Sequence, residues 1–456
     1  MRFKKYDRTI VDKKLAATQY SHWTREMASL IEQKPNTTFP VYNPVKVRPL
    51  LEGWHVWDSW YVTTESGAIA DVNGYRVLVG LARPVEGNDA SVARIYFFYS
   101  KDNVHYASGG PLFKKKLYDD CNEWSGSTIL RNDGKLQTFY TIAKGVEMNG
   151  NWQTLQRFAT AIQTVNKSSD GLAFGDPSYH DELIEPDGFY YETAWQASVR
   201  ESRMPCLHNR ALGSDQTENS CFRDPHFYVD KKTNKKYLVF EANTGEGCCP
   251  PGSIHRSYIG SNDYDPEYAP TMDELKANGC VGVLELMDSD YTLGCFQAPW
   301  LTANLVTDEI ERINVIDHDN HVYLFVVGHG NKNCLVTYND DLNNLDYMLG
   351  FRADTFLSPL KPLNDSGVVV CQKSPGAAYG GQEVNQQYVY SWELFPTAKA
   401  GIFDCTSYAN FSYDVKDGQI KAVKSAGPTI QVRISGETTE IVSRKHDILP
   451  IGAGDL

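Results

Sequence analysis

The stretch SCFRDPHFYVDKKTNKKYLVFEANTG, residues 220–245, decides the fold class. Apolar and aromatic residues at 227–229 and 237–240 flank a polar, turn-prone segment, which predicts a β-hairpin. A charged Arg223-Asp224-Pro225 triplet opens the first strand. Taken alone, this triplet is typical of a solvated turn with a proline at the first position of a strand. The hairpin therefore indicates β structure, and the triplet needs a further explanation.

Similar strands recur through nearly the whole chain, separated by Gly, Asn and Asp turns and without a βαβ rhythm. This pattern predicts an all-β fold, and a propeller is one of the few ways to close so many strands. Residues 23–31, WTREMASLI, carry the helix-like spacing. Because neither a blade-length repeat nor a linker is visible, we expect one domain, 1–456, with 1–50 as an N-terminal segment packed on it. The clearest strands are YRVLVGLA (75–82), ARIYFFYS (93–100), LQTFYTIA (136–143), KKYLVFEA (235–242), HVYLFVVG (321–328) and QYVYSWELF (387–395).

Composition excludes several classes of function. The chain has 456 residues, with Lys+Arg 44 against Asp+Glu 57 and a formal net charge of −13, so we expect no nucleic-acid partner. Apolar runs such as 323–327 are far shorter than the ~20 residues of a membrane helix. The start, MRFKKYDRTI, lacks the apolar region of a signal peptide. We therefore expect no membrane segment and no signal peptide in this chain.

The ten cysteines include no CxxC pair, so a structural zinc site is not expected. The even number and the adjacent Cys248-Cys249 fit disulfides in an exported protein. Buried free thiols fit a chain of this length as well, and both alternatives stay open.

Three stretches place carboxylates among aromatic residues at the ends of strand-like runs. GWHVWDSWYV contains Asp58, the RDP triplet contains Asp224, and VTDEIERINV contains Glu309 and Glu311, followed by Arg312. If the last stretch is a strand, Glu309 and Glu311 point to the same face. Each would then raise the pKa of the other, and a close arginine would lower both.

Cleavage of a glycosidic bond needs such a set: an ionised carboxylate that attacks the anomeric carbon, a protonated carboxyl group that donates to the leaving oxygen, and aromatic faces that hold the ring. Charged loop residues are more often only solvated. The residue types alone therefore leave a structural role open for each of these acids.

The three stretches together, in this order, resemble glycoside hydrolase family 68, the levansucrases, inulosucrases and related β-fructofuranosidases. RDP alone also occurs in other fructosidase families, whereas WDSW, RDP and DEIER together are specific. Further similar segments run from about residue 22 to residue 330, with a weaker one near the C-terminus. They are HWTREMASLIEQKPNTTFPVYNP (22–44), EWSGSTIL (123–130), RDPHFYVD (223–230), FEANTG (240–245), DYTL (290–293), TDEIER (307–312) and LNDSGVVV (363–370).

The resemblance implies a role for each matching acid. Asp58 corresponds to the nucleophile that forms a covalent fructosyl-enzyme, and Glu311 to the acid/base. Asp224 corresponds to the stabiliser of the transition state, which would explain the triplet: the charged pair faces the sugar. Arg223 and Glu309 would bind hydroxyl groups around the scissile bond.

The resemblance also implies a fructose pocket. Trp57, Trp124 and Ser125 would line it, and Glu241 would support it from behind. The alternatives are ordinary ones: tryptophans such as these and Trp60 are more often core residues, and a serine is by default a turn residue.

Two further residues concern the glucose or acceptor side. His329, in FVVGHGNKN, stands where many Gram-positive members carry Arg and many Gram-negative members His, so the resemblance implies that it influences which acceptor receives the fructosyl group. Arg312 would bind substrate as well, or serve only as a counter-ion to Glu311.

Calcium is a secondary candidate. In Gram-positive members an Asp before the Glu pair binds calcium, matched here by Asp308, with Glu218 and Asn278 as further matches. Cys249 falls where another ligand is expected, and thiols are poor calcium ligands. We therefore expect no cofactor and a disulfide in place of the ion.

These observations predict a five-bladed β-propeller with a short helical N-terminal segment, as the family implies. The predicted function is a retaining fructosyltransferase that cleaves sucrose and transfers fructose to sugar acceptors or water; the alternative is a β-fructofuranosidase that mainly hydrolyses sucrose. A carbohydrate-binding or inactive propeller would lack one of the three acids, and a structural or adhesion protein would not need them. We also expect a secreted protein and a monomer.

Overall fold

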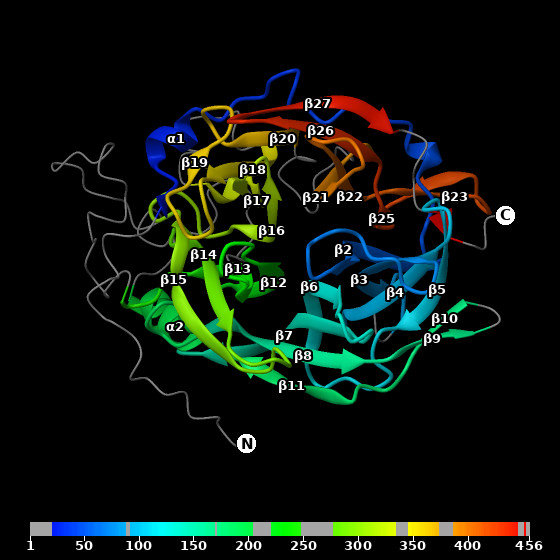
Figure 1. Cartoon of the computed structure of the whole chain (residues 1–456), viewed down its shortest axis with the longest axis horizontal. Coiled ribbons are helices and arrows are strands. Elements are labelled where there is room, and N and C mark those ends of the chain that lie inside the picture. Colours follow the sequence, from blue (N-terminus) through cyan, green and yellow to red (C-terminus); the bar gives the residue numbers. More distant parts are fainter. Residues whose placement is uncertain are drawn as a thin grey trace.

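The computed structural model describes residues 21–87, 92–168, 171–203, 220–247, 277–333, 345–373, 386–445 and 451–452. Five groups of antiparallel strands, the blades, stand around a common centre (Figure 1). The first strand of each blade lies innermost. The five-bladed, all-β prediction is confirmed.

Blades I and II share one sheet, because their inner strands β2 and β6 pair in parallel at one end. A short hairpin, β9 and β10, follows β8 and lies beside blade I, where Phe174 stacks on Phe97 of β4 (Figure 1). Blade I consists of β2 Trp54–Thr64, β3 Arg76–Pro84, β4 Arg94–Ser100, β5 His105–Pro111 and the C-terminal β28 Ile451–Gly452. Blade II consists of β6 Asn122–Leu130, β7 Leu136–Met148, β8 Asn151–Gln163 and β11 Tyr179–Ile184. The hairpin consists of β9 Val165–Ser168 and β10 Gly171–Phe174.

Blades III, IV and V are separate sheets. Blade III consists of β12 Phe222–Val229, β13 Lys236–Asn243, β14 Gly279–Leu286, β15 Gly294–Thr302 and the N-terminal β1 Ser21–His22. Blade IV consists of β16 Glu311–His318, β17 His321–His329, β18 Leu345–Ala353, β19 Lys361–Pro362 and β20 Val368–Lys373. Blade V consists of β21 Val389–Pro396, β22 Ile402–Ala409, β25 Ser425–Ala426, β26 Thr429–Ser435 and β27 Thr438–Lys445, beside the hairpin β23 Ser412–Asp414 with β24 Gln419–Lys421.

The hydrophobic core is divided among the five seams between neighbouring blades. One cluster of buried residues fills each seam. Between blades II and III, for example, the rings of Phe158 and Phe222 stack with their centroids 4.1 Å apart. The seam between blades V and I is filled by fewer residues, among them Phe98 and Ala426. Packing at the seams therefore holds the ring together and leaves its centre to polar side chains.

The N-terminal segment 21–50 runs along three blades. β1 pairs with β15 of blade III, the Phe39 amide donates to the Cys371 carbonyl of blade IV at 2.7 Å, and the Tyr413 amide beside blade V donates to the Val47 carbonyl at 2.8 Å. The segment then leads into β2, whose Val56 amide donates to the Lys424 carbonyl at 2.9 Å. It thus joins the last blade to the first.

The predicted N-terminal helix is shorter than the pattern suggests. α1 spans Arg25–Ser29, and the Thr24 hydroxyl caps it by accepting from the Met27 amide at 3.2 Å. A second helix, α2 Ala194–Arg203, was not expected; it lies beside blade II, where Asn149 donates to Ser198 at 2.8 Å. Two 3₁₀ turns, η3 Pro44–Lys46 and η5 Gly330–Lys332, lie in the N-terminal segment and directly after β17.

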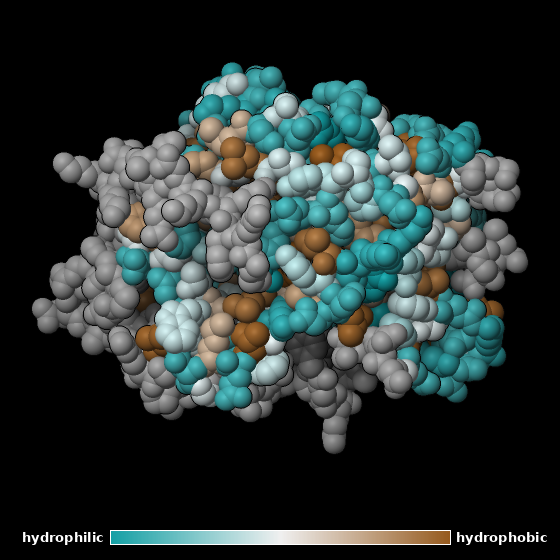
Figure 2. Space-filling model, turned by 90° about the horizontal axis from the view of Figure 1, so that it is seen from below, coloured by the Kyte–Doolittle hydropathy of each residue, from teal (hydrophilic) through white to brown (hydrophobic). Residues whose placement is uncertain are grey.

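The surface seen from below is mostly hydrophilic, with separate small hydrophobic spots (Figure 2). Among the described residues, no helix has the length and apolar character needed to cross a bilayer.

The N-terminal segment is expected to contribute to stability. Trp23 is 1% exposed and packs edge-on against Tyr347 of blade IV, with centroids 6.2 Å apart. Trp23→Ala should therefore lower the free energy of unfolding by about 3–5 kcal/mol, measured by chemical denaturation. Trp152→Ala, at a tryptophan that is 72% exposed, is the matched control and should change it by less than about 0.5 kcal/mol. Equal effects of the two variants would contradict this account of the segment.

Candidate active site

Each inner strand carries an irregularity that turns side chains toward the centre. In every blade the register between the first and second strands shifts by one residue. A bulge of this kind re-aims a side chain that regular alternation would place elsewhere. In four blades the bulged residue has a positive φ, rare for a residue other than glycine. These residues are Asp58 (φ 41°), Asp224 (φ 57°), Arg312 (φ 53°) and Ser391 (φ 61°); in blade II the shift falls at Ser125.

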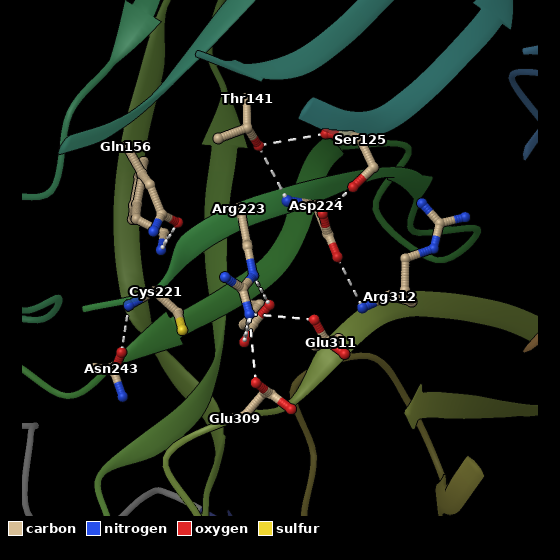
Figure 3. Close-up of polar contacts among 12 residues, drawn as sticks. Ser125, Thr141, Gln156, Cys221, Arg223, Asp224, Asn243, Glu309, Glu311 and Arg312 are labelled. Atoms are coloured by element: carbon tan, nitrogen blue, oxygen red, sulfur yellow. Dashed lines mark hydrogen bonds and ion pairs between the residues drawn. The ribbon is translucent and has the colours of Figure 1, made fainter. Parts of the chain in front are cut away.

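The RDP triplet lies inside β12 and not at its start. Asp224 and Pro225 form the bulge, between the paired residues Arg223 and His226. Proline is tolerated there, since a bulge interrupts the hydrogen-bond ladder. The side chains of Arg223 and Asp224 thus both contact residues of blade IV (Figure 3).

Arg223 connects three acidic side chains. Its Nε donates to Glu241 Oε2 at 2.7 Å, and one terminal nitrogen lies 3.2 Å from Glu311 Oε1 and 3.8 Å from Glu309 Oε2 (Figure 3). Glu241 is fully buried, and burial raises its pKa well above the usual range, opposed by Arg223. The guanidinium plane also lies 5.9 Å from the ring of Trp124. Arg223 is therefore fixed from behind and directed at the acid pair.

Asp224 is held by the two neighbouring blades, II and IV. The Ser125 hydroxyl of blade II donates to Asp224 Oδ1, and the Arg312 backbone amide of blade IV donates to Oδ2 at 3.1 Å (Figure 3). The Asp224 amide donates to Thr141 Oγ1 at 3.2 Å. These bonds to neighbouring blades fix the carboxylate despite its strained backbone.

Asp58 lies in an environment of mixed charge. Burial raises the pKa of its carboxyl group, the Arg312 guanidinium opposes this, and nearby Asp224 adds to it. Lys424 and the Ser391 hydroxyl lower it again. The net pKa lies above the usual range for Asp. Two cations therefore face Asp58: Arg312 of blade IV, and Lys424, which directly precedes β25 of blade V.

Arg312 forms an ion pair with Glu393, and Glu311 is one of several further acids whose charge acts on it. Its guanidinium lies 3.5 Å from Glu393 Oε2 and donates to the Ser59 carbonyl at 3.0 Å. Burial raises the pKa of Glu393 to about 7, against the effect of Arg312. Arg312 thus connects blades I, III, IV and V beneath the acids.

Glu309 and Glu311 face the same arginine, but for a different reason from the one predicted. β16 begins at Glu311, so Glu309 precedes the strand and does not alternate with it. Burial and the Glu309 charge raise the pKa of Glu311 to about 7, while Arg223 and His329 oppose them. At Glu309 burial acts in the same direction, but Lys332 (3.6 Å), His329 and Arg223 outweigh it, and the pKa falls below the usual value. The two acids therefore differ in protonation near neutral pH.

The predicted tryptophans have two different environments. Trp57 is half-buried between two cations, with Arg83 at 5.7 Å and Lys424 at 5.6 Å from its ring. Trp124 is likewise half-buried, beside Arg223. Trp60 is 2% exposed and donates to Thr128 Oγ1 at 3.1 Å, so it belongs to the core.

His329 ends β17 beside the acid pair. Its ring stacks on Tyr390, with centroids 4.1 Å apart and an interplanar angle of 9°. A ring nitrogen and carboxylate oxygens of Glu309 and Glu311 lie within 4.8 Å of one another. The structure therefore brings His329 together with Glu309 and Glu311, two other predicted site residues.

Blade V supplies residues that the sequence did not reveal. The Tyr390 hydroxyl donates to Glu311 Oε2 at 2.6 Å, Ser391 faces Asp58, and Glu393 pairs with Arg312. The segment YSWE resembles WDSW in placing an aromatic ring before the bulged residue, and this was the only signal available. No sequence motif pointed to Lys332 or Lys424 as residues of the site.

The calcium candidates fit an ion only in part. Asp308 is buried, and its Oδ1 accepts no hydrogen bond from the residues described. The Asn278 side-chain oxygen, however, already accepts from Asn243 at 2.9 Å. Glu218 and Cys249 lie outside the described residues. No step below uses a metal.

The cysteines leave the disulfide prediction as it was. Cys121, Cys295, Cys371 and Cys405 are free thiols. Cys206, Cys248, Cys249 and Cys334 lie outside the described residues.

Comparison with known proteins agrees with this arrangement. The model of the family described as Levansucrase/Invertase matches residues 13–454. The chain is 32% identical to a levansucrase of Bacillus amyloliquefaciens (95% of this chain, 90% of the relative) and 28% identical to an extracellular sucrase of Zymomonas mobilis (92% of each).

Two solved structures are also similar. One is an inulosucrase from Halalkalicoccus jeotgali bound to kestose, with TM-score 0.71 and 28% identity over 96% of this chain and 99% of that one. The other is a Bacillus subtilis levansucrase variant in complex with oligosaccharides, with TM-score 0.74 and 25% identity over 96% and 97%. The predicted resemblance is confirmed: the chain belongs to glycoside hydrolase family 68, the levansucrase and invertase family.

Proposed function

We propose that this chain cleaves sucrose with retention of configuration, through a fructosyl group bound to Asp58, and passes that group to a sugar or to water. Family membership supports a sucrose-dependent fructosyltransferase. The observation that carries the finer proposal is the meeting of Asp58, Asp224 and Glu311, from three blades, around Arg223 and Arg312.

Glu311 is the proposed acid/base. With a pKa of about 7, it is partly protonated near neutral pH and can donate to the glycosidic oxygen as the bond to glucose breaks. The resulting carboxylate then takes a proton from the hydroxyl group of the acceptor, whose oxygen attacks the anomeric carbon and releases the carboxylate of Asp58. Arg223 and Tyr390 stabilise this carboxylate, since both lower its pKa.

Asp58 is the proposed nucleophile. Its carboxylate attacks the anomeric carbon of the fructosyl unit, and the electron pair of the broken bond leaves with the glucose oxygen that Glu311 protonates. Arg312 and Lys424 favour the ionised form that this step needs. Asp224, fixed by Ser125 and the Arg312 amide, would hold fructose hydroxyl groups as the ring flattens.

The remaining residues would bind substrate. Trp57 and Trp124 would contact the fructose, and Glu241 would hold Arg223 in place. Glu309 and His329 would contact the glucose or acceptor. Sugar acceptors are supported by relatives solved with kestose and with oligosaccharides.

We further propose that residues 1–456 act as one catalytic domain and as a monomer. Secretion is supported by the extracellular sucrase among the relatives.

The first test is to incubate the purified protein with sucrose and quantify free glucose and free fructose over time. We expect more glucose than fructose, because transferred fructose does not appear as the free sugar. Asp58→Ala should lower glucose release by about 10⁴-fold or more, since it removes the carboxylate that forms the covalent intermediate. Glu440→Ala, at a surface ion pair with Arg433, should match the parent. Equal amounts of both sugars would show a hydrolase; activity of Asp58→Ala would refute the proposed mechanism.

The pH profile tests the role of Glu311. Activity requires its protonated form, so it should fall as the pH rises through about 7. Tyr390→Phe removes a hydrogen bond that stabilises the carboxylate, raises the pKa of Glu311 and should move this alkaline limb upward by about 0.5–1 pH unit. Tyr413→Phe, on the β23 hairpin, should leave the limb unchanged. A downward shift in Tyr390→Phe would contradict the assignment.

A further inference from the structure

A buried carboxylate that no step above uses lies directly behind His329. Asp346 of β18 is 1% exposed and pairs in register with His329 across the β17–β18 ladder. Its Oδ1 lies 2.9 Å from His329 Nδ1, and its Oδ2 accepts from the Tyr388 hydroxyl at 2.6 Å. Neither the sequence motifs nor the proposed chemistry gives this residue a role.

We propose that Asp346 is a positioning residue that keeps His329 a permanent imidazolium cation on the glucose and acceptor side of the active site. The inference rests on the proposed function, because it assigns the residue that sets the charge at this part of the same site. Asp346 does not reach the acid pair itself and acts through His329.

The geometry fixes the ring as well as its charge. Asp346 holds one edge of the imidazole, Tyr390 covers one face of it, and the Tyr390 hydroxyl continues to Glu311. The four side chains therefore form a continuous chain of contacts from a buried carboxylate to the proposed acid/base. A substitution of Asp346, at the buried end of this chain, should therefore alter substrate binding.

The charges around His329 explain why the cation is stable. Burial by itself lowers the pKa of the imidazole, but Asp346, with smaller contributions from Glu309 and Glu311, raises it to about 9. Lys332, on η5, faces Glu309 at 3.6 Å. The groups that face the ring are thus Asp346 from β18, Tyr390 from β21, and Glu309 and Glu311 from the start of blade IV. Tyr388, just before β21, contacts Asp346, and Lys332 and Arg223 contact Glu309.

A charged donor binds a sugar hydroxyl group more strongly than a neutral one does. If Asp346 is made neutral, burial should dominate, and His329 should lose its proton within the working range of the enzyme. Binding of sucrose should then become pH-dependent through His329, separately from the effect of Glu311 on the chemical step.

The experiment compares KM for sucrose and kcat from about pH 5.5 to about pH 8.5 in four proteins: the parent, Asp346→Asn, His329→Arg and the double variant. In the parent we expect KM to change by less than about twofold, because the cation persists. In Asp346→Asn, KM should rise about tenfold toward the alkaline end. In the double variant KM should again be independent of pH, since arginine keeps its charge without Asp346.

A merely structural role for Asp346 predicts a different result. Asp346→Asn would then weaken the enzyme equally at every pH and in both the His329 and Arg backgrounds, and the proposal would be overturned. Asp354→Asn is the matched control, because the exposed Asp354 faces His321 at 3.8 Å, at the opposite end of β17 from His329, and it should change neither constant.

Direct titration keeps the proposal testable if Asp346→Asn does not fold. NMR of the parent protein with ¹⁵N-labelled histidine, assigned with His329→Arg, should show His329 titrating near 9; titration at or below about 6.5 would refute the proposal. A parent that releases no glucose from sucrose would refute the proposed function instead, and the titration would still report on Asp346.

Discussion

One extra residue in the inner strand of each blade is the constraint on which the active site depends. A regular strand would send alternate side chains into the seams, where the hydrophobic clusters lie. The bulges at Asp58, Asp224 and Arg312 interrupt this alternation and bring charged side chains to the centre of the ring. A positive φ at such residues is costly, and bonds between blades offset the cost: the Arg312 amide, itself part of a bulge, donates to Asp224. The strained positions therefore support one another across the ring.

The second feature is the way in which closely packed acids are kept chemically different. Arg223 faces Glu241, Glu309 and Glu311, yet only Glu309 has a pKa below its usual value, because Lys332 and His329 also act on it. Glu311 has a raised pKa, since burial and the Glu309 charge outweigh the cations. The proposed chemistry needs one acid that stays protonated near neutral pH beside ionised neighbours, and an unequal environment of this kind provides it. Here the difference arises from where the cations lie, and blade V contributes to it through Tyr390.

Much of the fold and of the site could be predicted from the sequence. The features that could not be predicted escaped for physical reasons. Strand periodicity gave the all-β class, and the clustered motifs gave the family and the three acids, because bulged residues keep their neighbours in sequence. The repeat itself was invisible, since the bulges at 58, 125, 224, 312 and 391 are unequally spaced by loops of different length. Tyr390, Glu393 and Asp346 were missed because their importance comes from partners in other strands or blades. Arg312, expected to bind substrate or to serve as a counter-ion to Glu311, pairs with Glu393 of another blade, a partner that its sequence neighbours do not reveal.

The central claim is that Asp58, turned inward by its bulge, carries the fructosyl group during the reaction. The most direct measurement is mass spectrometry of peptides from protein mixed with sucrose and quenched in acid within one turnover. The account predicts an added mass of one fructosyl group on the peptide that contains Asp58. An adduct on the peptide that contains Asp224 or Glu311, or glucose release without any adduct at the earliest times, would contradict it.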